Sequence, residues 1–338
     1  MFQKKYYPLL FLIIISLIAS SCNQKSNKTN SNKQFKSDKF KVVGYLSSKN
    51  LDKLDIIDLT LLTHLNLAFA NPDQNGTLVF NGEQDLEKTV SKAHKAGVKV
   101  FISIAGGSTN KDLPLNWLSV LQPENRKVFV QEIVNFVMKN DLDGVDVDIE
   151  WNLMPTIGNL YTPFVIELRK ALKSNKKGIS SALNVSGLHE AITQEALLAY
   201  DFINIMVYDK TGPWRPDDPG PHAPYSYAKQ ALEYWTKERK IPVENLTLGV
   251  PFYGYDFDKV NSITYGNLVA LDTANAYKDR VGEIYYNGIP TIVKKTQFAM
   301  ESFGGIMIWE LAQDAQNELS LLKAINKTIV SGSINEDK

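Results

Sequence analysis

Short apolar segments alternate with helical patterns along most of this chain, and this alternation limits the possible folds more than any other feature. Eight runs rich in β-branched and aromatic residues end at polar residues, proline or glycine, which is typical of buried parallel strands. These runs cover residues 40–47, 65–70, 98–105, 143–151, 179–185, 202–208, 246–252 and 305–309. The chain therefore predicts an α/β fold.

Segments with helical spacing separate these strands, and they cover residues 51–59, 84–96, 123–139, 160–172, 194–200, 225–238, 294–303 and 319–329. Repeated βα units predict parallel strands, and a count of eight favours a closed TIM (β/α)8 barrel over an open doubly wound sheet. No Gly-x-Gly-x-x-Gly loop follows the first strand, which removes the commonest reason to choose the open sheet. We expect one barrel domain.

The fourth predicted strand carries a row of acidic residues. At the two-residue period of a strand, Asp146, Asp148 and Glu150 lie on one face, and the short apolar residues between them lie on the other. This pattern predicts that the acids line an interior. Carboxylates about 7 Å apart at Cα cannot all ionise easily, so we expect a retained proton and a Glu150 that is partly protonated near neutral pH. The alternatives are an exposed acidic strand and a hydrated cation site.

Active sites of (β/α)8 barrels lie at the C-terminal ends of the strands. The residues at these ends are mainly carboxylates, hydroxyls and aromatics, namely Asn71, Ser103, Gly106, Gly107, Asp148, Glu150, Tyr208, Asp209, Tyr253, Trp309 and Glu310. Such a set fits a sugar-cleaving site, where a protonated acid meets the glycosidic oxygen and aromatic faces hold sugar rings. The four histidines are scattered, and we expect them to be structural or exposed. We therefore expect no metal and no cofactor.

Four motifs resemble those of glycoside hydrolase family 18, the family of chitinases and related endo-β-N-acetylglucosaminidases. Asp143-Gly-Val-Asp146-Val-Asp148-Ile-Glu150 matches the Asp-x-x-Asp-x-Asp-x-Glu signature at every specified position. Ser103-Ile-Ala-Gly106-Gly107 is similar to the Ser-x-Gly-Gly element with one extra residue. Met206-Val-Tyr208-Asp209 matches Met-x-Tyr-Asp, and Trp309 lies where the family ends its eighth strand in Trp. The motifs follow the family order from residue 40 to about residue 330.

The resemblance implies retaining hydrolysis of β-1,4 linkages in N-acetylglucosamine-containing glycans, such as chitin or chitooligosaccharides. The 2-acetamido oxygen of the substrate would attack the anomeric carbon and form an oxazolinium ion. Glu150 would protonate the leaving oxygen and then activate water, and Asp148 would bind the acetamido N–H with Asp146 as its charge and proton partner. Tyr208 would position the acetamido group. The substrate-binding candidates are Met206, Asp209, Trp309, Tyr253, Ser103 and Gly107.

Two other functions stay open at this point. One is an endo-β-N-acetylglucosaminidase that cleaves N-glycan cores, and the other is a non-catalytic glycan-binding protein on the same scaffold. Retention of Glu150, Asp148 and Tyr208 argues against the binding protein, because lectin-like relatives typically lose the acid. Many family members also insert an α+β domain between the last two strands. Only 51 residues lie between positions 254 and 304 here, so we expect no full insertion domain and an open cleft.

The N-terminus is similar to a bacterial lipoprotein signal. Lys4 and Lys5 precede an apolar run, and small residues lead into Cys22, the only cysteine. We expect a signal peptide at residues 1–22 and an exported protein lipidated at Cys22. A plain secreted protein and a buried free cysteine are the alternatives. Residues 23–39, rich in Asn, Lys and Ser, predict a flexible linker, followed by the catalytic barrel at 40–332 and a tail at 333–338.

The charge balance bears on the partners of the protein. The charges of its 37 basic and 37 acidic residues cancel, so the chain has no excess of positive charge that would indicate binding to nucleic acid. We expect a monomer whose partner is a GlcNAc-containing polysaccharide or glycan, and which reaches the membrane only through its lipid anchor.

Overall fold

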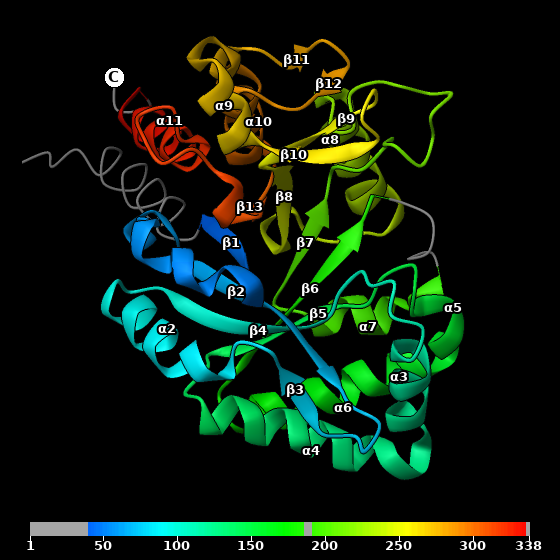
Figure 1. The fold of residues 1–338 in the computed structure, drawn as a ribbon. Helices are drawn as coiled ribbons and strands as arrows, with labels where there is room; N and C mark the ends of the chain where they lie inside the picture. The colour runs from blue at the N-terminus through cyan, green and yellow to red at the C-terminus, as the bar shows by residue number, and fades with distance from the viewer. Residues whose placement is uncertain (1–39, 186–190, 336–338) are drawn as a thin grey trace, which may run out of the picture. The chain divides into compact units, whose positions relative to one another are not determined.

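Figure 1 shows a computed structural model of the chain, which describes residues 40–185 and 191–335. The expected signal peptide with Cys22, the linker, and residues 336–338 of the expected tail lie outside the described residues. Among the described residues, no helix is both long enough and apolar enough to cross a membrane.

Eight parallel strands close into a barrel, because β1 pairs with both β2 and β13. The strands are β1 (Lys41–Ser47), β2 (His64–Pro72), β4 (Lys99–Ala105), β5 (Gly144–Asp148), β6 (Gly178–Asn184), β7 (Phe202–Met206), β8 (Leu246–Pro251) and β13 (Gly305–Trp309). A short strand, β3 (Leu78–Phe80), runs antiparallel to the end of β2. The predicted TIM barrel is confirmed.

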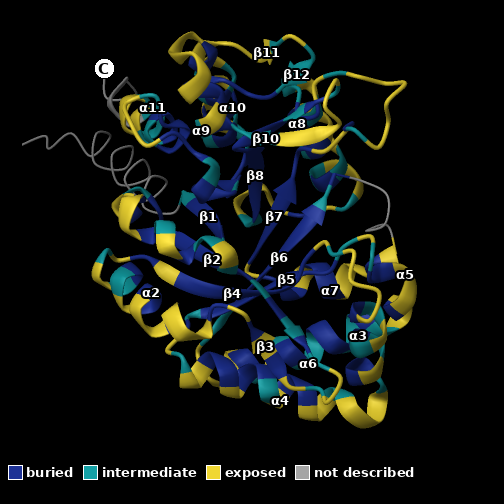
Figure 2. Ribbon diagram, viewed as in Figure 1, coloured by how far each residue is buried: buried dark blue, intermediate teal, exposed yellow. Residues whose placement is uncertain are grey.

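Helices surround the barrel and bury their apolar faces against it (Figure 2). They are α2 (Glu83–Lys95), α3 (Leu113–Leu121), α4 (Pro123–Lys139), α5 (Met154–Ile157), α6 (Tyr161–Ser174), α7 (Gln194–Ala199), α8 (Tyr225–Glu233), α10 (Ile289–Ser302) and α11 (Leu321–Asn335). Short 3-10 turns occupy Ser48–Ile56, Leu59–Leu61, Gly158–Leu160, Val243–Asn245, Thr273–Tyr277 and Leu311–Gln313, and a π turn occupies Tyr234–Glu238.

The structure differs from the predicted elements in several places. The helix expected at residues 51–59 is replaced by two 3-10 segments, Ser48–Ile56 and Leu59–Leu61, and the first of them is kinked at Asn50, whose φ of −121° is not helical. Strand β5 ends at Asp148, because the carbonyl of Glu150 already accepts the N–H groups of Leu153 and Met154 in a turn. Helix α11 continues to Asn335, into the segment expected to be the tail.

The segment between β8 and β13 forms a small antiparallel sheet that no pattern in the sequence predicts. Its strands are β9 (Tyr253–Asp256), β10 (Asn261–Thr264), β11 (Arg280–Val281) and β12 (Ile284–Tyr285), in the order β10-β9-β12-β11, and helix α9 (Tyr265–Leu271) follows β10. The strands are only two to four residues long. Strand β9 follows β8 directly, so it places two tyrosines at the C-terminal end of the barrel.

The barrel interior contains a polar layer. Alternate side chains of each strand point inward, and several of these are polar but fully buried, namely Asn66, Ser103, Asp146, Ser180, Asn204 and Thr247. Aromatic and methionine side chains fill the interior around them. The acids of β5 therefore face an interior, as their strand period predicts.

Candidate functional site

A cavity of about 490 Å³ opens at the C-terminal ends of the barrel strands. Its size lies within the usual range for ligand pockets, roughly 300–1,000 Å³. The lining residues are Tyr45, Phe69, Gly107, Ser108, Thr109, Asp148, Glu150, Trp151, Ala182, Met206, Tyr208, Asp209, Tyr253 and Trp309. Eight of the ten predicted site residues are therefore in the pocket lining, and Asp146 and Ser103 are not.

Asp146 lies beneath the pocket and accepts four hydrogen bonds. Its Oδ2 accepts from the hydroxyls of Tyr45 and Ser103, both at 2.7 Å. Its Oδ1 accepts from Ser180 at 2.6 Å and from Asn204 Nδ2 at 3.2 Å. Burial raises the pKa of Asp146, and these four hydrogen bonds oppose the rise by stabilising the carboxylate. Asp146 is thus a fixed polar support for the floor of the pocket.

The position of Ser103 differs from the one expected for a substrate-binding residue. We expected it to bind substrate, but its side chain is fully buried and its hydroxyl donates to Asp146. Tyr45, Ser180 and Asn204 were not predicted at all. Their sequence signal is a polar residue at an inward-facing position of an otherwise apolar strand, as with Asn204 in Phe-Ile-Asn-Ile-Met.

Asp148 forms part of the pocket floor and is only 3% exposed. Its Oδ1 is buried and has no hydrogen-bond partner among the described residues. Burial raises the pKa of Asp148 well above its usual value, and the negative charges of Glu150 and Asp146 raise it further. Its surroundings therefore favour the neutral form of Asp148, and its Oδ1 is an oxygen that can serve a bound ligand.

Glu150 lies just beyond the end of β5, against the glycine-rich end of β4. Burial raises the pKa of Glu150 to about 7, a backbone hydrogen bond from Gly107 opposes the rise, and the charge of Asp209 adds to it. A Cβ atom at residue 107 would lie 2.9 Å from Oε1 of Glu150, so glycine leaves the room that this carboxyl group occupies. A carboxylic acid with a pKa near 7 is suited to general acid catalysis.

Tyr208 is buried beside these acids. Its hydroxyl contacts the sulfur of Met307 at 3.8 Å, a weak acceptor. Burial raises its pKa well above the usual value, and the charges of Asp148, Asp209, Glu150 and Asp146 act in the same direction. Tyr208 therefore stays a neutral hydroxyl that can donate a hydrogen bond to a ligand in the pocket.

Aromatic side chains form one wall of the pocket. Trp309 stacks on Phe69, with ring centroids 5.5 Å apart and planes 17° apart, and Tyr45 packs against the same indole at 5.6 Å. Trp151 also lines the pocket and is 53% exposed. Trp214 is exposed near the pocket and meets Tyr255 edge to face, at 5.2 Å. Flat apolar faces of this kind suit sugar rings.

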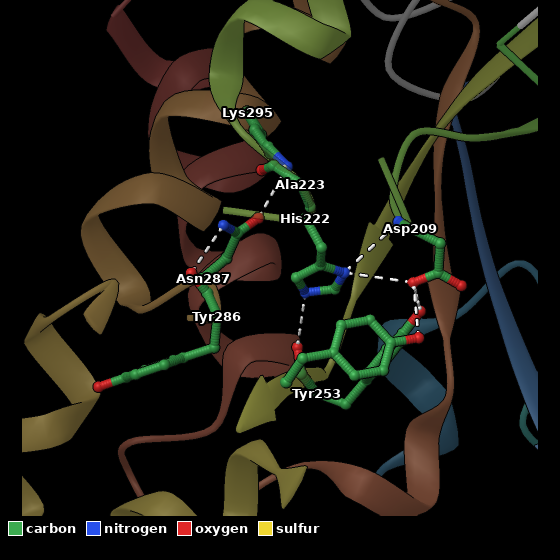
Figure 3. A network of polar contacts seen from close by, with 8 residues as sticks. Asp209, His222, Ala223, Tyr253, Tyr286, Asn287 and Lys295 are labelled. Carbon is green, nitrogen blue, oxygen red and sulfur yellow. Dashed lines mark hydrogen bonds and ion pairs between the residues drawn. The ribbon is translucent and has the colours of Figure 1, made fainter. Parts of the chain in front are cut away.

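Asp209 also lines the pocket, and three side chains contact its Oδ1, of which Figure 3 labels Tyr253 and His222. The hydroxyls of Tyr253 and Tyr255 donate to this oxygen at 2.5 and 3.0 Å. His222 Nδ1 lies 3.2 Å from the same oxygen. Tyr255 and His222 were not predicted, because both belong to segments without strand or helix periodicity.

The described histidines do not form a metal site. His222 and His64 are buried, and His94 pairs with Asp143 at the start of β5, 2.9 Å between Nε2 and Oδ2. Among the described residues, no group of three or more His, Cys, Asp or Glu side chains could hold a metal ion.

Known proteins resemble the chain over most of its described length. Residues 41–314 match the family described as Glycosyl hydrolases family 18. The crystal structure of a family 18 chitinase from the chitin utilization locus of Flavobacterium johnsoniae is 46% identical, with a TM-score of 0.83 over 87% of this chain and 94% of that one. A chitinase structure from Bacteroides thetaiotaomicron is 31% identical, with a TM-score of 0.76 over 86% and 96% of the two chains.

A curated relative matches over a shorter stretch. A chitinase-like effector of Moniliophthora roreri is 33% identical over 220 residues, which are 58% of this chain and 53% of the effector. The chain thus spans about half the length of that relative. On the family match and the two structures, this chain belongs to glycosyl hydrolases family 18.

Proposed function

We propose that this protein hydrolyses β-1,4 linkages in chitin or chitooligosaccharides by a substrate-assisted, retaining mechanism. The observation that carries the proposal is that Glu150, whose pKa is raised to about 7, and the buried Asp148, whose pKa is raised well above its usual value, line one pocket. An acid that is protonated near neutral pH can protonate a glycosidic oxygen. Both family 18 structures described above are chitinases, which supports chitin as the substrate class.

The state of Asp148 supports assistance by the substrate. A covalent carboxylate nucleophile must be ionised and must reach the anomeric carbon. Asp148 is almost completely buried and its pKa is raised well above the usual value, so it is a poor nucleophile. Its unpartnered Oδ1 is an available acceptor for the acetamido N–H of the substrate. The acetamido oxygen is then the group that attacks.

The proposed steps follow from these positions. The acetamido oxygen bonds to the anomeric carbon while the glycosidic bond breaks, and the proton of Glu150 passes to the leaving oxygen. Water then attacks the anomeric carbon and opens the oxazolinium ion, while Glu150 takes a proton from this water. This step restores the acid and gives a product with the original configuration at the anomeric carbon. The neutral hydroxyl of Tyr208 donates to the acetamido group, and Trp309 supports the sugar ring from below.

The first test compares substrates. The purified protein should release shorter products from chitooligosaccharides, and it should leave fully deacetylated glucosamine oligosaccharides uncleaved, because these lack the internal nucleophile. Mass spectrometry of the products measures both results. Equal cleavage of the deacetylated oligosaccharide would exclude the assisted mechanism. A high-mannose glycopeptide in a parallel reaction tests the endo-β-N-acetylglucosaminidase alternative, and binding without turnover of any substrate would indicate a glycan-binding protein.

The close contact between Gly107 and Glu150 gives a second prediction. In Gly107→Ala, the added methyl group would push the Glu150 carboxyl from its position, since it would lie 2.9 Å from Oε1. Misplacing a catalytic group by about 1 Å lowers rates by roughly 100-fold, and we expect a fall in kcat of about 10- to 100-fold.

The matched control for this variant is Gly220→Ala, where an added Cβ would meet nothing within 4 Å. Initial rates on chitooligosaccharides and thermal melting curves separate lost catalysis from lost folding. Wild-type kcat in a folded Gly107→Ala protein would show that the site tolerates a displaced Glu150.

A further inference from the structure

The chain turns sharply where β4 ends, at residues 105–107, and this β4 turn lies against Glu150. Ala105 and Gly106 have φ values of +81° and +78°, in the left-handed region that an alanine seldom adopts. The turn brings Gly107 next to the acid, because a Cβ atom at this residue would lie 2.9 Å from Oε1 and 3.5 Å from Cδ of Glu150. A backbone of this kind persists only where the surrounding structure holds it.

The first peptide group of the β4 turn, between Ala105 and Gly106, is held from both sides. Its carbonyl oxygen accepts a hydrogen bond from Nδ2 of Asn71 in β2, at 2.9 Å. Its N–H donates to the carbonyl oxygen of Asp148 in β5, at 2.7 Å. The plane of this peptide is therefore fixed between the two neighbouring strands of the barrel.

The next peptide group, between Gly106 and Gly107, reaches the acid itself. The N–H of Gly107 donates to the carboxyl group of Glu150. The carbonyl oxygen of Gly106 accepts a weaker hydrogen bond from Nδ2 of Asn152, at 3.4 Å. Because the two peptide groups share Gly106, a rotation of the first one would turn the N–H of Gly107 away from Glu150.

Trp117 of α3 sets the orientation of the Asn71 side chain. Its Nε1–H donates to Oδ1 of Asn71 at 2.8 Å, so the amide oxygen faces the indole and the amide nitrogen faces Ala105. The indole is fully buried and packs edge to face on Phe129 and Phe164, with centroids 5.6 and 6.0 Å away. Asn71 thus connects the rigid helical layer to the β4 turn.

We propose that Asn71, oriented by Trp117, is a positioning residue for Glu150: it holds the β4 turn so that the N–H of Gly107 points at the carboxyl group of the general acid. The inference rests on the proposed function. The pocket lining, as far as the structure describes it, contains neither Asn71 nor Trp117. Their effect on the reaction therefore passes through the turn and not through contact with the sugar.

Asn71→Leu keeps the size of the side chain and removes its hydrogen bonds to Ala105 and Trp117. With the turn released, Glu150 loses its fixed position, and a catalytic group displaced by about 1 Å lowers rates by roughly 100-fold. Since Glu150 keeps its other surroundings, we expect a smaller fall in kcat of about 10-fold. KM should stay within about twofold of the wild type, because the residues that hold the sugar are unchanged.

The pH profile gives a readout that a purely structural role would not move. The hydrogen bond from Gly107 stabilises the ionised form of Glu150, so its loss raises the pKa of the acid. The general acid must be protonated, and the alkaline limb of kcat/KM should therefore move upward by roughly half a pH unit. The titratable groups that face Glu150 are Asp148, Tyr208 and Asp209, and the substitution leaves all three in place.

The matched control is Asn116→Leu in the same helix as Trp117. Asn116 Nδ2 donates to the carbonyl oxygen of Pro72 at 3.1 Å, so it makes the same kind of hydrogen bond to the residue that follows Asn71. This bond does not involve the β4 turn. Melting curves should show a similar loss of stability in the two variants, whereas Asn116→Leu should keep the wild-type kcat and alkaline limb.

Trp117→Phe tests the connection between the two side chains. It removes the N–H that orients Asn71, and its kcat should fall by about threefold. In the double variant with Asn71→Leu, kcat should equal that of Asn71→Leu alone, because the effect of Trp117 passes through Asn71. A double variant whose loss is the product of the two single losses would contradict this connection.

Nitrogen-15 NMR of the glycine-labelled full chain tests the contact without turnover. The amide signal of Gly107, assigned by its loss in Gly107→Ala, should shift as Glu150 ionises, with a midpoint near pH 7. In Asn71→Leu the size of this shift should fall at least twofold, and in Asn116→Leu it should be unchanged. Asn71→Ala takes the place of Asn71→Leu if the latter does not fold.

Two results would overturn the inference in a folded Asn71 variant. One is a Gly107 signal that titrates as in the wild type, and the other is a wild-type kcat with an unmoved alkaline limb. Absence of turnover by the unmodified protein on every substrate would instead contradict the proposed function, and the Gly107 signal would then decide on Asn71 alone.

Discussion

Glu150→Gln should lose nearly all turnover while it keeps its affinity for chitooligosaccharides. The amide has almost the shape of the acid and can still accept the backbone hydrogen bond of Gly107. It has no proton to give to the leaving oxygen and cannot take one from water. General acid–base catalysis contributes about 10²- to 10⁴-fold, and Glu150 would serve in both steps, so we expect a fall in kcat near the upper end of this range.

Initial rates and calorimetric binding of an uncleaved oligosaccharide measure the two expectations separately. The control is Glu167→Gln, which breaks an ion pair with Arg126 in the helical layer, 2.8 Å between the charged atoms, and should leave kcat unchanged. Wild-type turnover by Glu150→Gln would contradict the assignment of the acid. Loss of both binding and the folded state would point to a structural role instead.

The raised pKa of Glu150 also has a consequence for stability. Its pKa is about 7 in the folded protein, above the usual value of 4.5, so the folded state binds more protons than the unfolded state between these values. The free energy of unfolding therefore decreases as pH rises through this window. Glu150→Gln removes the titrating group, and its melting temperature should exceed that of the wild type at pH 8. The same buried acid that enables proton transfer thus lowers the stability of the fold.

The acidic strand could be predicted from the sequence, because its pattern lies in consecutive residues. The two-residue period alone places Asp146, Asp148 and Glu150 on one face, and the barrel places that face inside. The partners of Asp146 could not be read in this way. Tyr45 in β1 and Asp146 in β5 are 101 residues apart, and they meet in the interior only because the barrel closes through the pairing of β1 with β13.

Other parts of the site were missed for a different reason. Strands β9 to β12 have two to four residues each, which is too short for the alternation of apolar and polar residues to be recognised. Tyr255 lies in one of them. His222 lies in a proline-rich segment whose sequence indicates a loop but not where its side chains point. Its contacts with Asp209 and Tyr253 join segments far apart in the sequence, and no local pattern encodes them.

Asp148→Asn should lower kcat by about 10²- to 10³-fold, the range found when one preorganised group that stabilises a transition state is removed. Asn has nearly the same size, and its carbonyl can still accept the acetamido N–H, so we expect little change in KM. It can never carry the negative charge that balances the oxazolinium ion. Since burial raises the pKa of Asp148 and so favours its neutral form in the protein without substrate, the neutral amide should not destabilise the fold.

The matched control is Asp143→Asn, at the opposite end of the same strand. Asp143 accepts from Val100 N at 2.7 Å and contacts His94 at 2.9 Å, so its replacement should reduce stability by about 1 kcal/mol and leave kcat unchanged.

Azide distinguishes the two possible roles of Asp148. If Asp148 were a covalent nucleophile, azide would restore turnover to Asp148→Ala and give an α-glycosyl azide. In the assisted mechanism the acetamido group still occupies that face of the sugar, so azide should not restore turnover and should give no α-glycosyl azide. An α-glycosyl azide product would overturn the mechanism.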